Sequence, residues 1–358
     1  MKVDFLIVGL GIAGMTFIEH LRRFDRSFVV YENESQNSSL VAGGLYNPVV
    51  LKRFTPVWNT KEQLDYALPF YKDLEQAFGK QYDFPIDILR IFKSVEEQNN
   101  WFACADHPTL SEFMVPEVFP NTIPQLKAPL GFGKIQKAGK VEIGVLIADY
   151  RNKLTAEGTL LKKEFHYDEL IEKDNRIFYE DYEVKHLIFC EGYGLQVNPY
   201  FNFLPLQGLK GEVLDIYAPE LKLESMIKSS VFLLPLGDDK YKVGATFNKD
   251  IKDSEPTAEG REELINNLNE FLDTPYEVTG HYAGMRPTVK DRRPLLGEHP
   301  IHKNFYIFNG MGTRGVMLAP LMAQKLYQYI ENGVSLPGET DIKRFRKYSR
   351  LAYSAQKY

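Results

Sequence analysis

The sequence predicts an α/β fold joined to a second part that is largely β, and two observations lead to this expectation. Residues 3–32 show an apolar strand, a glycine turn, a helical run and a second apolar strand that ends on an acid. Apolar strands run into further glycine turns at positions 192 and 310, and the chain between them is rich in short strand patterns. We therefore expect a Rossmann-like unit and a second α+β unit.

The first glycine turn has the spacing of a dinucleotide-binding turn. Gly9 turns the chain after the strand, so that the helix starts with free backbone amides facing a pyrophosphate. A side chain at Gly11 would hold the phosphates away, and one at Gly14 would separate helix from strand. Glu32 ends the second strand, where a carboxylate accepts ribose hydroxyls and repels a 2′-phosphate. This predicts FAD or NAD rather than NADP, with a ligand-free turn in an ordinary βαβ unit as the alternative.

Composition excludes several classes of protein. Lys and Arg total 43 against 48 Asp and Glu, a net charge of −5, which argues against a surface that coats nucleic acid or membrane. Cys104 and Cys190 are the two cysteines, so neither a disulfide framework nor a cysteine metal site is expected. The N-terminal apolar run is too short for a membrane span. We expect a cytoplasmic protein without metal.

Periodicity and turn residues predict the remaining elements. Pro69 should kink or break the first of the later helices, and the proline-rich residues 106–130 should form a surface excursion. The predicted helices are 61–78, 94–105, 142–155, 257–272 and 316–330, and the predicted strands are 176–179, 184–190, 212–216, 231–234, 241–246, 277–286 and 304–309.

The motifs along nearly the whole chain, in their order and spacing, resemble the FAD-dependent D-amino acid oxidase family, which includes glycine oxidase and sarcosine oxidase. Individually they are modest, and together they are specific. They are residues 9–32, Ser38 to Leu45, Phe189 to Gly192, Leu206 to Glu212, Leu234-Pro235, Val243 to Thr246, Ala283 to Thr288, Asp291 with Pro294 to Gly297, and Gly310 to Pro320.

The resemblance implies a discontinuous, GR2-type FAD-binding domain of residues 1–55, 141–205 and 284–358. The substrate domain, on a mixed and largely antiparallel sheet, would comprise residues 56–140 and 206–283. The FAD contacts that the resemblance implies are Gly9, Gly11, Ile12, Ala13, Gly14, Glu32, Asn33, Ser38, Ser39, Ala42, Gly43, Gly44, Leu45, Leu170, Cys190, Glu191, Gly192, Arg286, Gly312, Thr313, Arg314, Gly315 and Val316. The FAD would be bound non-covalently, because the chain lacks the cysteine or histidine to which relatives attach it.

Three residues are expected to act on the substrate. The family holds an arginine at the position of Arg286 that binds the substrate carboxylate as a two-pronged fork, with a structural ion pair to Asp291 as the alternative. Arg314 would be a second anchor, a flavin ligand or the partner of a surface carboxylate. A carboxylate-binding tyrosine of glycine oxidase is missing before Leu234-Pro235, and Tyr46 would compensate for it.

The predicted function is oxidation of a small amine or amino acid to an imine, by hydride transfer from its α-carbon to flavin N5, with O2 or another electron acceptor. Gly44 to Pro48 also resembles the oxidase domain of bifunctional tRNA wobble-uridine enzymes, which remove an N-carboxymethyl group. Two more functions stay open, namely an NAD-dependent dehydrogenase and a non-catalytic flavin-binding module. Substrate identity and oligomeric state are not predicted.

Overall fold

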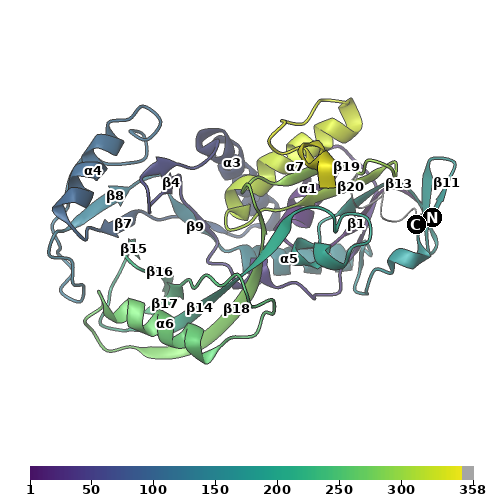
Figure 1. Cartoon of the computed structure of the whole chain (residues 1–358). Helices are drawn as coiled ribbons and strands as arrows, with labels where there is room; N and C mark the ends of the chain where they lie inside the picture. Colours follow the sequence, from purple (N-terminus) through teal and green to yellow (C-terminus); the bar gives the residue numbers. More distant parts are fainter. Residues whose placement is uncertain (349–358) are drawn as a thin grey trace. The chain divides into compact units, whose positions relative to one another are not determined.

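The computed structural model describes residues 1–348 and divides into two compact units (Figure 1). Unit 1 comprises residues 1–40, 143–209 and the chain from 285, and unit 2 comprises residues 41–142 and 210–284. The end of the expected FAD-binding segment 284–358 lies outside the described residues. Residues 41–55 belong to unit 2, and the assignment of the two units to cofactor and substrate stays a prediction.

Unit 1 is built on an eight-stranded sheet with a parallel centre. β1 pairs in parallel with β2 and β13, and β13 pairs in parallel with β20. The strands are β1 (Lys2–Val8), β2 (Phe28–Tyr31), β10 (Leu160–Leu161), β11 (Ile171–Lys173), β12 (Arg176–Tyr179), β13 (Tyr182–Phe189), β19 (Leu295–Glu298) and β20 (Phe305–Asn309). The central strands are buried on both faces, so their sequences are almost continuously apolar.

Among the helices of unit 1, α1 connects β1 to β2, α5 precedes β10 and α7 follows β20. α1 and α7 lie side by side next to the central strands (Figure 1). A Cβ on Gly315 of α7 would approach Ile12 of α1. The helices are α1 (Ile12–Arg23), α2 (Ser38–Val41), α5 (Ile143–Ala156) and α7 (Gly315–Asn332), with short 3₁₀ turns at Tyr167–Glu169, Gly192–Val197 and Ile342–Phe345.

Unit 2 contains a seven-stranded sheet in the order β18-β14-β17-β16-β15-β7-β8. The pair β15–β7 is parallel, whereas β14–β17, β17–β16, β16–β15 and β7–β8 are antiparallel. Its strands are β7 (Ile88–Ile91), β8 (Phe132–Ile135), β14 (Leu206–Tyr217), β15 (Met226–Lys228), β16 (Phe232–Gly237), β17 (Lys240–Gly244) and β18 (Glu277–Val289). The structure thus confirms the α/β class and the mixed, largely antiparallel second sheet.

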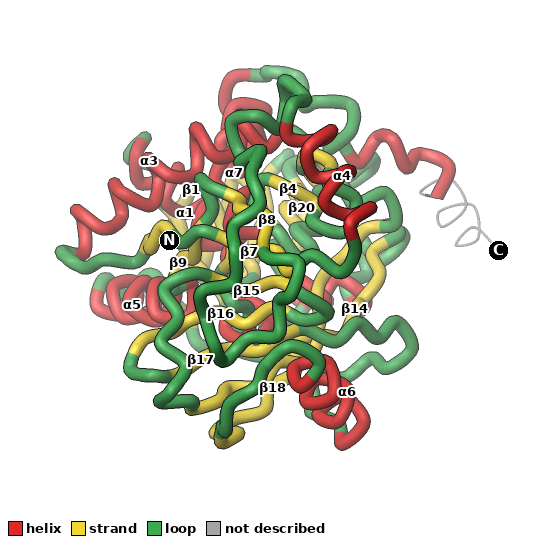
Figure 2. The backbone as a smooth tube through the Cα atoms, turned by 90° about the vertical axis from the view of Figure 1, so that its left-hand side faces the viewer, coloured by secondary structure: helices red, strands yellow, loops and turns green. Residues whose placement is uncertain are grey.

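The remaining elements of unit 2 surround this sheet. α6 (Ala258–Asn269) lies beside β18 (Figure 2) and packs on one face of the sheet through Leu264 and Leu268. The others are α3 (Thr60–Phe78), α4 (Val95–Ala105), β3 (Leu45–Tyr46), β4 (Val49–Val50), β5 (Thr55–Pro56), β6 (Asp83–Pro85) and β9 (Gly139–Val141).

Of the expected kink or break at Pro69, the break is wrong, because α3 runs unbroken from Thr60 to Phe78. Pro69 is exposed, whereas Leu64, Ala67 and Tyr71 on the buried stripe hold the helix on its core. The carbonyl that loses its intrahelical donor therefore faces water, which can bind it. No helix within residues 1–348 combines the length and the apolar character needed to cross a bilayer.

Candidate functional site

The first glycine turn of unit 1 is tightly packed at two of its three glycines. A Cβ on Gly9, which has φ +98°, would lie 2.6 Å from the carbonyl oxygen of Cys190. A Cβ on Gly14 would lie 2.1 Å from the carbonyl oxygen of Gly9. Both glycines are therefore required for the close approach of β1, α1 and the end of β13.

Gly11 differs from these two, because the nearest atom to its Cβ would be Ser39 Oγ at 3.4 Å. Gly11 is the N-cap of α1 and has no side chain to cap the helix, so first-turn amides such as that of Ala13 lack an intrahelical partner. The amide of Ile12 donates to Ser39 Oγ at 3.3 Å. Open space beside exposed helix amides fits a diphosphate.

Glu32 lies at this turn and is only 7% exposed. Its carboxylate accepts the amides of Leu10 and of Glu34, the latter at 2.8 Å, and Arg151 of α5 lies 3.5 Å away. These contacts hold the carboxylate in place. Its two oxygens have about four lone pairs, so some remain to accept hydrogen bonds from hydroxyl groups. The structure therefore fits an adenosine ribose here.

The second predicted turn follows β13, directly beside the first. Burial raises the pKa of the Cys190 thiol, and Cys190 Cβ would be 3.7 Å from a Cβ on Gly14. Burial also raises the pKa of Glu191 to about 7, opposed by hydrogen bonds donated by Tyr167 Oη and by Asn198 Nδ2, the latter at 2.6 Å. Glu191 is thus held on both carboxyl oxygens by side chains of unit 1.

The third turn leads into α7 and contacts the first and the second glycine turn. The amide of Gly312 donates to Pro287 O at 3.0 Å, and a Cβ on Gly315 would lie 3.0 Å from Ile12 Cγ2. Asn309 Nδ2 donates to the carbonyl oxygen of Gly192 at 2.9 Å. Unit 1 therefore brings the turns at 9–14, 190–192 and 310–315 together, as a single elongated ligand would require.

Arg286 lies half-buried on β18, two residues before Thr288, and burial lowers the pKa of its guanidinium. Thr288 Oγ1 is the nearest atom, at 3.7 Å, to a Cβ on Gly312, so the strand that bears Arg286 adjoins the third turn. Asp291 forms its ion pair with Arg344, at 2.8 Å. The role of Arg286 in binding substrate stays a prediction.

Arg314 is the N-cap residue of α7 and is also half-buried. Burial lowers the pKa of its guanidinium first, and the charges of Arg292 and Arg293 lower it further. Among residues 1–348, no carboxylate forms an ion pair with Arg314. Arg293 is itself paired with Glu339 at 3.4 Å, so the positive position at the start of α7 consists of Arg314 and Arg292, and it favours an anion.

The predicted flavin-facing loop belongs mainly to unit 2. A Cβ on Gly43 would come within 3.4 Å of Leu234 Cδ2 and 3.7 Å of Phe232 Cζ, so the loop packs on the sheet there. A Cβ on Gly44 would lie 1.8 Å from Val141 O, which only glycine permits. The same loop contains Ala42 and Leu45, and Leu45 pairs with Lys140 of β9.

Tyr46 lies at the other end of this loop and is only 2% exposed. A Cβ on Gly139 would lie 2.2 Å from Tyr46 Oη. Burial raises the pKa of the Tyr46 phenol, and the negative charge of Asp83 raises it further. The hydroxyl is thus surrounded by groups of unit 2, and its contact with substrate stays a prediction.

Two further residues predicted to contact FAD are Asn33, which lies just after Glu32, and Leu170, which packs against the core of unit 1. Asn33 Oδ1 accepts the amide of Ser35 at 3.1 Å, just after Glu32. Leu170 packs against the apolar core that contains Phe189, behind the second turn. Sequence reasoning missed Arg151, Tyr167 and Asn198. Arg151 and Tyr167 reach Glu32 and Glu191 from other segments of the chain, whereas Asn198 follows Glu191 closely, at the end of the 3₁₀ turn after β13.

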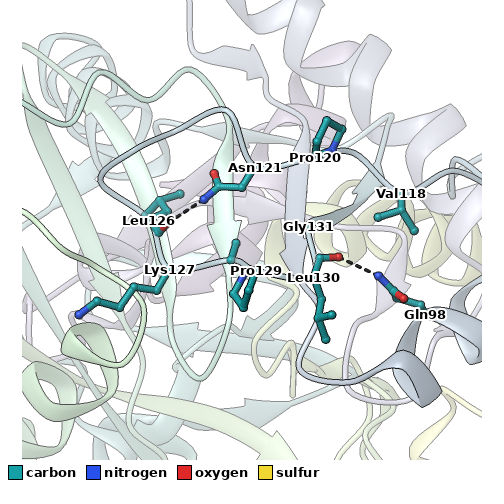
Figure 3. Close-up of a pocket in the computed structure, with 10 residues that line it drawn as sticks. Gln98, Val118, Pro120, Asn121, Leu126, Lys127, Pro129, Leu130 and Gly131 are labelled. Atoms are coloured by element: carbon teal, nitrogen blue, oxygen red, sulfur yellow. Dashed lines mark hydrogen bonds between the residues drawn. The ribbon is translucent and has the colours of Figure 1, made fainter.

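None of these residues lines the surface pocket of unit 2 that Figure 3 shows. Gln98 Nε2 donates to Leu130 O at 2.8 Å, and Asn121 Nδ2 donates to Leu126 O at 2.7 Å. Lys127 pairs with Asp273 at 3.1 Å. Its polar side chains are therefore engaged in holding the 118–131 loop.

Comparisons with known proteins bear on this geometry. A family model described as FAD dependent oxidoreductase matches residues 4–329. The tRNA 5-methylaminomethyl-2-thiouridine biosynthesis bifunctional protein MnmC of Idiomarina loihiensis is 31% identical over 134 residues, covering 36% of this chain and 21% of that protein. Glycine oxidase of Pseudomonas putida is 30% identical over 124 residues, covering 34% of each chain.

The matched segments span about a fifth to a third of the length of these curated relatives. The crystal structure of glycine oxidase from Geobacillus kaustophilus superposes with a TM-score of 0.77 at 17% identity, covering 96% of this chain and 98% of that one. This similarity shows a shared fold over nearly the whole length.

Proposed function

The chain belongs to the FAD dependent oxidoreductase family, and from this premise we propose that it oxidises a small amine or amino acid bearing a carboxylate. The supporting observation is that two half-buried arginines, Arg286 and Arg314, adjoin the third of three converging glycine turns. Family membership also selects FAD over NAD.

The residues of unit 1 fit the adenosine diphosphate part of FAD. The open space at Gly11 and the first-turn amides of α1 would hold the diphosphate, and Glu32 would accept the ribose hydroxyls. When bound, FAD supplies the two-electron acceptor for hydride from the substrate α-carbon. We infer non-covalent binding, as the sequence predicts.

Arg286 would bind and orient the substrate carboxylate through two parallel N–H···O bonds, a geometry that lysine cannot reproduce. The amine must react in its neutral form, so that its nitrogen lone pair can become the imine bond as hydride leaves the α-carbon. The nitrogen then loses a proton, and water hydrolyses the imine to a carbonyl compound and ammonia or an amine. O2 or another acceptor would take up the electrons.

Anaerobic reduction of the holoenzyme tests this function. The flavin absorbance is followed against matched pairs of substrates with and without the carboxylate, such as glycine with methylamine and sarcosine with dimethylamine. We expect bleaching by a carboxylated member and little by its partner. Bleaching by neither class would leave a non-catalytic flavin-binding module.

A second candidate is oxidation of an N-carboxymethylaminomethyl group on tRNA. The similarity to MnmC supports it, as does the positive position formed by Arg292 and Arg314. The net charge of −5 argues against it. Binding of tRNA whose affinity falls steeply with salt, together with flavin reduction by modified tRNA, would favour it.

A further inference from the structure

Arg151 is a charged residue on the buried stripe of α5, within unit 1. Ile147 and Leu154, four residues before it and three after it, are both fully buried on the same face of the helix. The strand that follows α5 pairs with β2, and the amide of Glu32 donates to Leu161 O at 3.1 Å. The fold thus fixes Arg151 beside the end of β2. A buried cation is costly unless it is paired, so its partners are informative.

The contacts of Arg151 leave much of its donor capacity unused. Its Nη2 lies 3.5 Å from Glu32 Oε1, and its Nη1 lies 3.8 Å from Glu34 Oε1. Both distances exceed the roughly 2.7–2.9 Å of a charge-assisted hydrogen bond. Within residues 1–348, Arg151 Nε is buried and has no hydrogen-bond partner. The Glu34 side chain is 55% exposed, so solvent screens its charge, and Glu32 is the main counter-charge of Arg151.

Glu32 is the acceptor that the donors at this position share. Besides Arg151, the amides of Leu10 and Glu34 donate to its carboxylate. Backbone amides beside a helix N-terminus and an arginine guanidinium are the groups that proteins use to bind phosphate. A carboxylate among them repels an anion and accepts hydrogen bonds from neutral hydroxyls instead. The charge of Glu32 therefore decides which kind of ligand Arg151 can bind.

We infer that Arg151 is a specificity-determining residue of the adenosine site, held in check by Glu32. With Glu32 present, the ion pair fixes the carboxylate for the ribose hydroxyls. Without the negative charge of Glu32, Arg151 binds a phosphate on the ribose 2′-oxygen. The inference rests on the proposed placement of the ribose at Glu32, and it can be tested by binding alone.

Calorimetric titration of the full-length apoprotein with ADP and with 2′-phospho-ADP tests the inference, because these probes differ by one phosphate. At constant ionic strength, the unaltered protein should bind ADP more tightly. Glu32→Ser removes the negative charge, shortens the side chain and leaves the two amides free to donate. This variant should bind ADP about tenfold more weakly than the unaltered protein and should bind 2′-phospho-ADP about tenfold or more tightly than ADP.

A second substitution in the Glu32→Ser background identifies the cation. Arg151→Met should abolish the preference for 2′-phospho-ADP, and Arg151→Lys should retain much of it because it keeps the charge. Lys153→Met is the matched control, since Lys153 lies on the same helix, pairs with Glu157 at 3.4 Å and should not affect the preference. Thermal unfolding shows which variants are folded, and Arg151→Gln supplies a second neutral side chain if Arg151→Met is not.

The outcomes separate this inference from the placement on which it rests. A preference for 2′-phospho-ADP that persists after Arg151→Met or Arg151→Gln would overturn the role of Arg151, because the amides alone would then bind the phosphate. The absence of any such preference in Glu32→Ser would overturn it as well. Equal ADP affinity in Glu32→Ser and the unaltered protein would instead contradict the placement of the ribose at Glu32.

Discussion

Substituting Gly11 by alanine separates the fold from the cofactor site. The new Cβ meets Ser39 Oγ at 3.4 Å, an ordinary contact, so the free energy of unfolding of the apoprotein should change by no more than about 0.5 kcal/mol. The methyl group would occupy the space beside the α1 amides. Losing one charge-assisted hydrogen bond to the diphosphate costs about 1.5–3 kcal/mol, or roughly 10- to 150-fold in the FAD dissociation constant.

The measurement is a fluorescence titration of apoprotein with FAD, beside thermal unfolding of the same sample. Gly144→Ala, in the first turn of α5, is the matched control, because its Cβ would lie 3.6 Å from Leu40 O; it should leave FAD affinity unchanged and should not lower apoprotein stability. Gly14→Ala should instead lower apoprotein stability by about 1–3 kcal/mol or more, since its Cβ would overlap Gly9 O. Unaltered FAD affinity in Gly11→Ala would refute the placement of the diphosphate.

Three further outcomes are expected. Because the folded-state pKa of Glu191 is raised to about 7, the folded protein holds its proton more tightly, so unfolding free energy should fall by up to ~2–3 kcal/mol as pH rises from about 4.5 to 7. Glu191→Gln should flatten that part of a denaturation series, and an unchanged slope would contradict the buried neutral carboxyl. Arg344→Met should cost about 1–2 kcal/mol by removing bonds to Asp291 and to Pro294 O, with FAD affinity preserved; a loss of FAD would contradict a purely structural pair. Glu32→Gln should weaken FAD binding about tenfold in the titration, and an equal dissociation constant would remove the ribose contact.

Local sequence was sufficient to predict the first glycine turn, because Gly9, Gly11, Gly14 and Glu32 lie within one βαβ unit. The strand at 212–216 was predicted too short, since β14 starts at Leu206. Gly208 lies in the part of β14 that was not predicted, and strand interiors seldom contain glycine; a Cβ on it would lie 2.3 Å from Tyr193 Cε2, so tertiary packing requires glycine there.

Sequence patterns could not predict the surroundings of site residues whose contacts come from distant segments of the chain. The burial of Tyr46 depends on pairing of β3 with β9, which places Gly139 opposite it. Arg151 reaches Glu32 only when α5 packs beside β2, and the charges of Arg292 and Arg293 act on Arg314 only in the fold. Such contacts carry no periodic signal in the sequence.

We propose that Arg286 anchors the carboxylate of the oxidised amine, and anaerobic flavin reduction of the Arg286→Ala and Arg286→Lys variants tests this role. Both variants should retain FAD, Arg286→Ala should lose flavin reduction by carboxylated amines, and Arg286→Lys should recover it only in part. Reduction of Arg286→Ala at the rate of the unaltered protein would exclude Arg286 as the anchor.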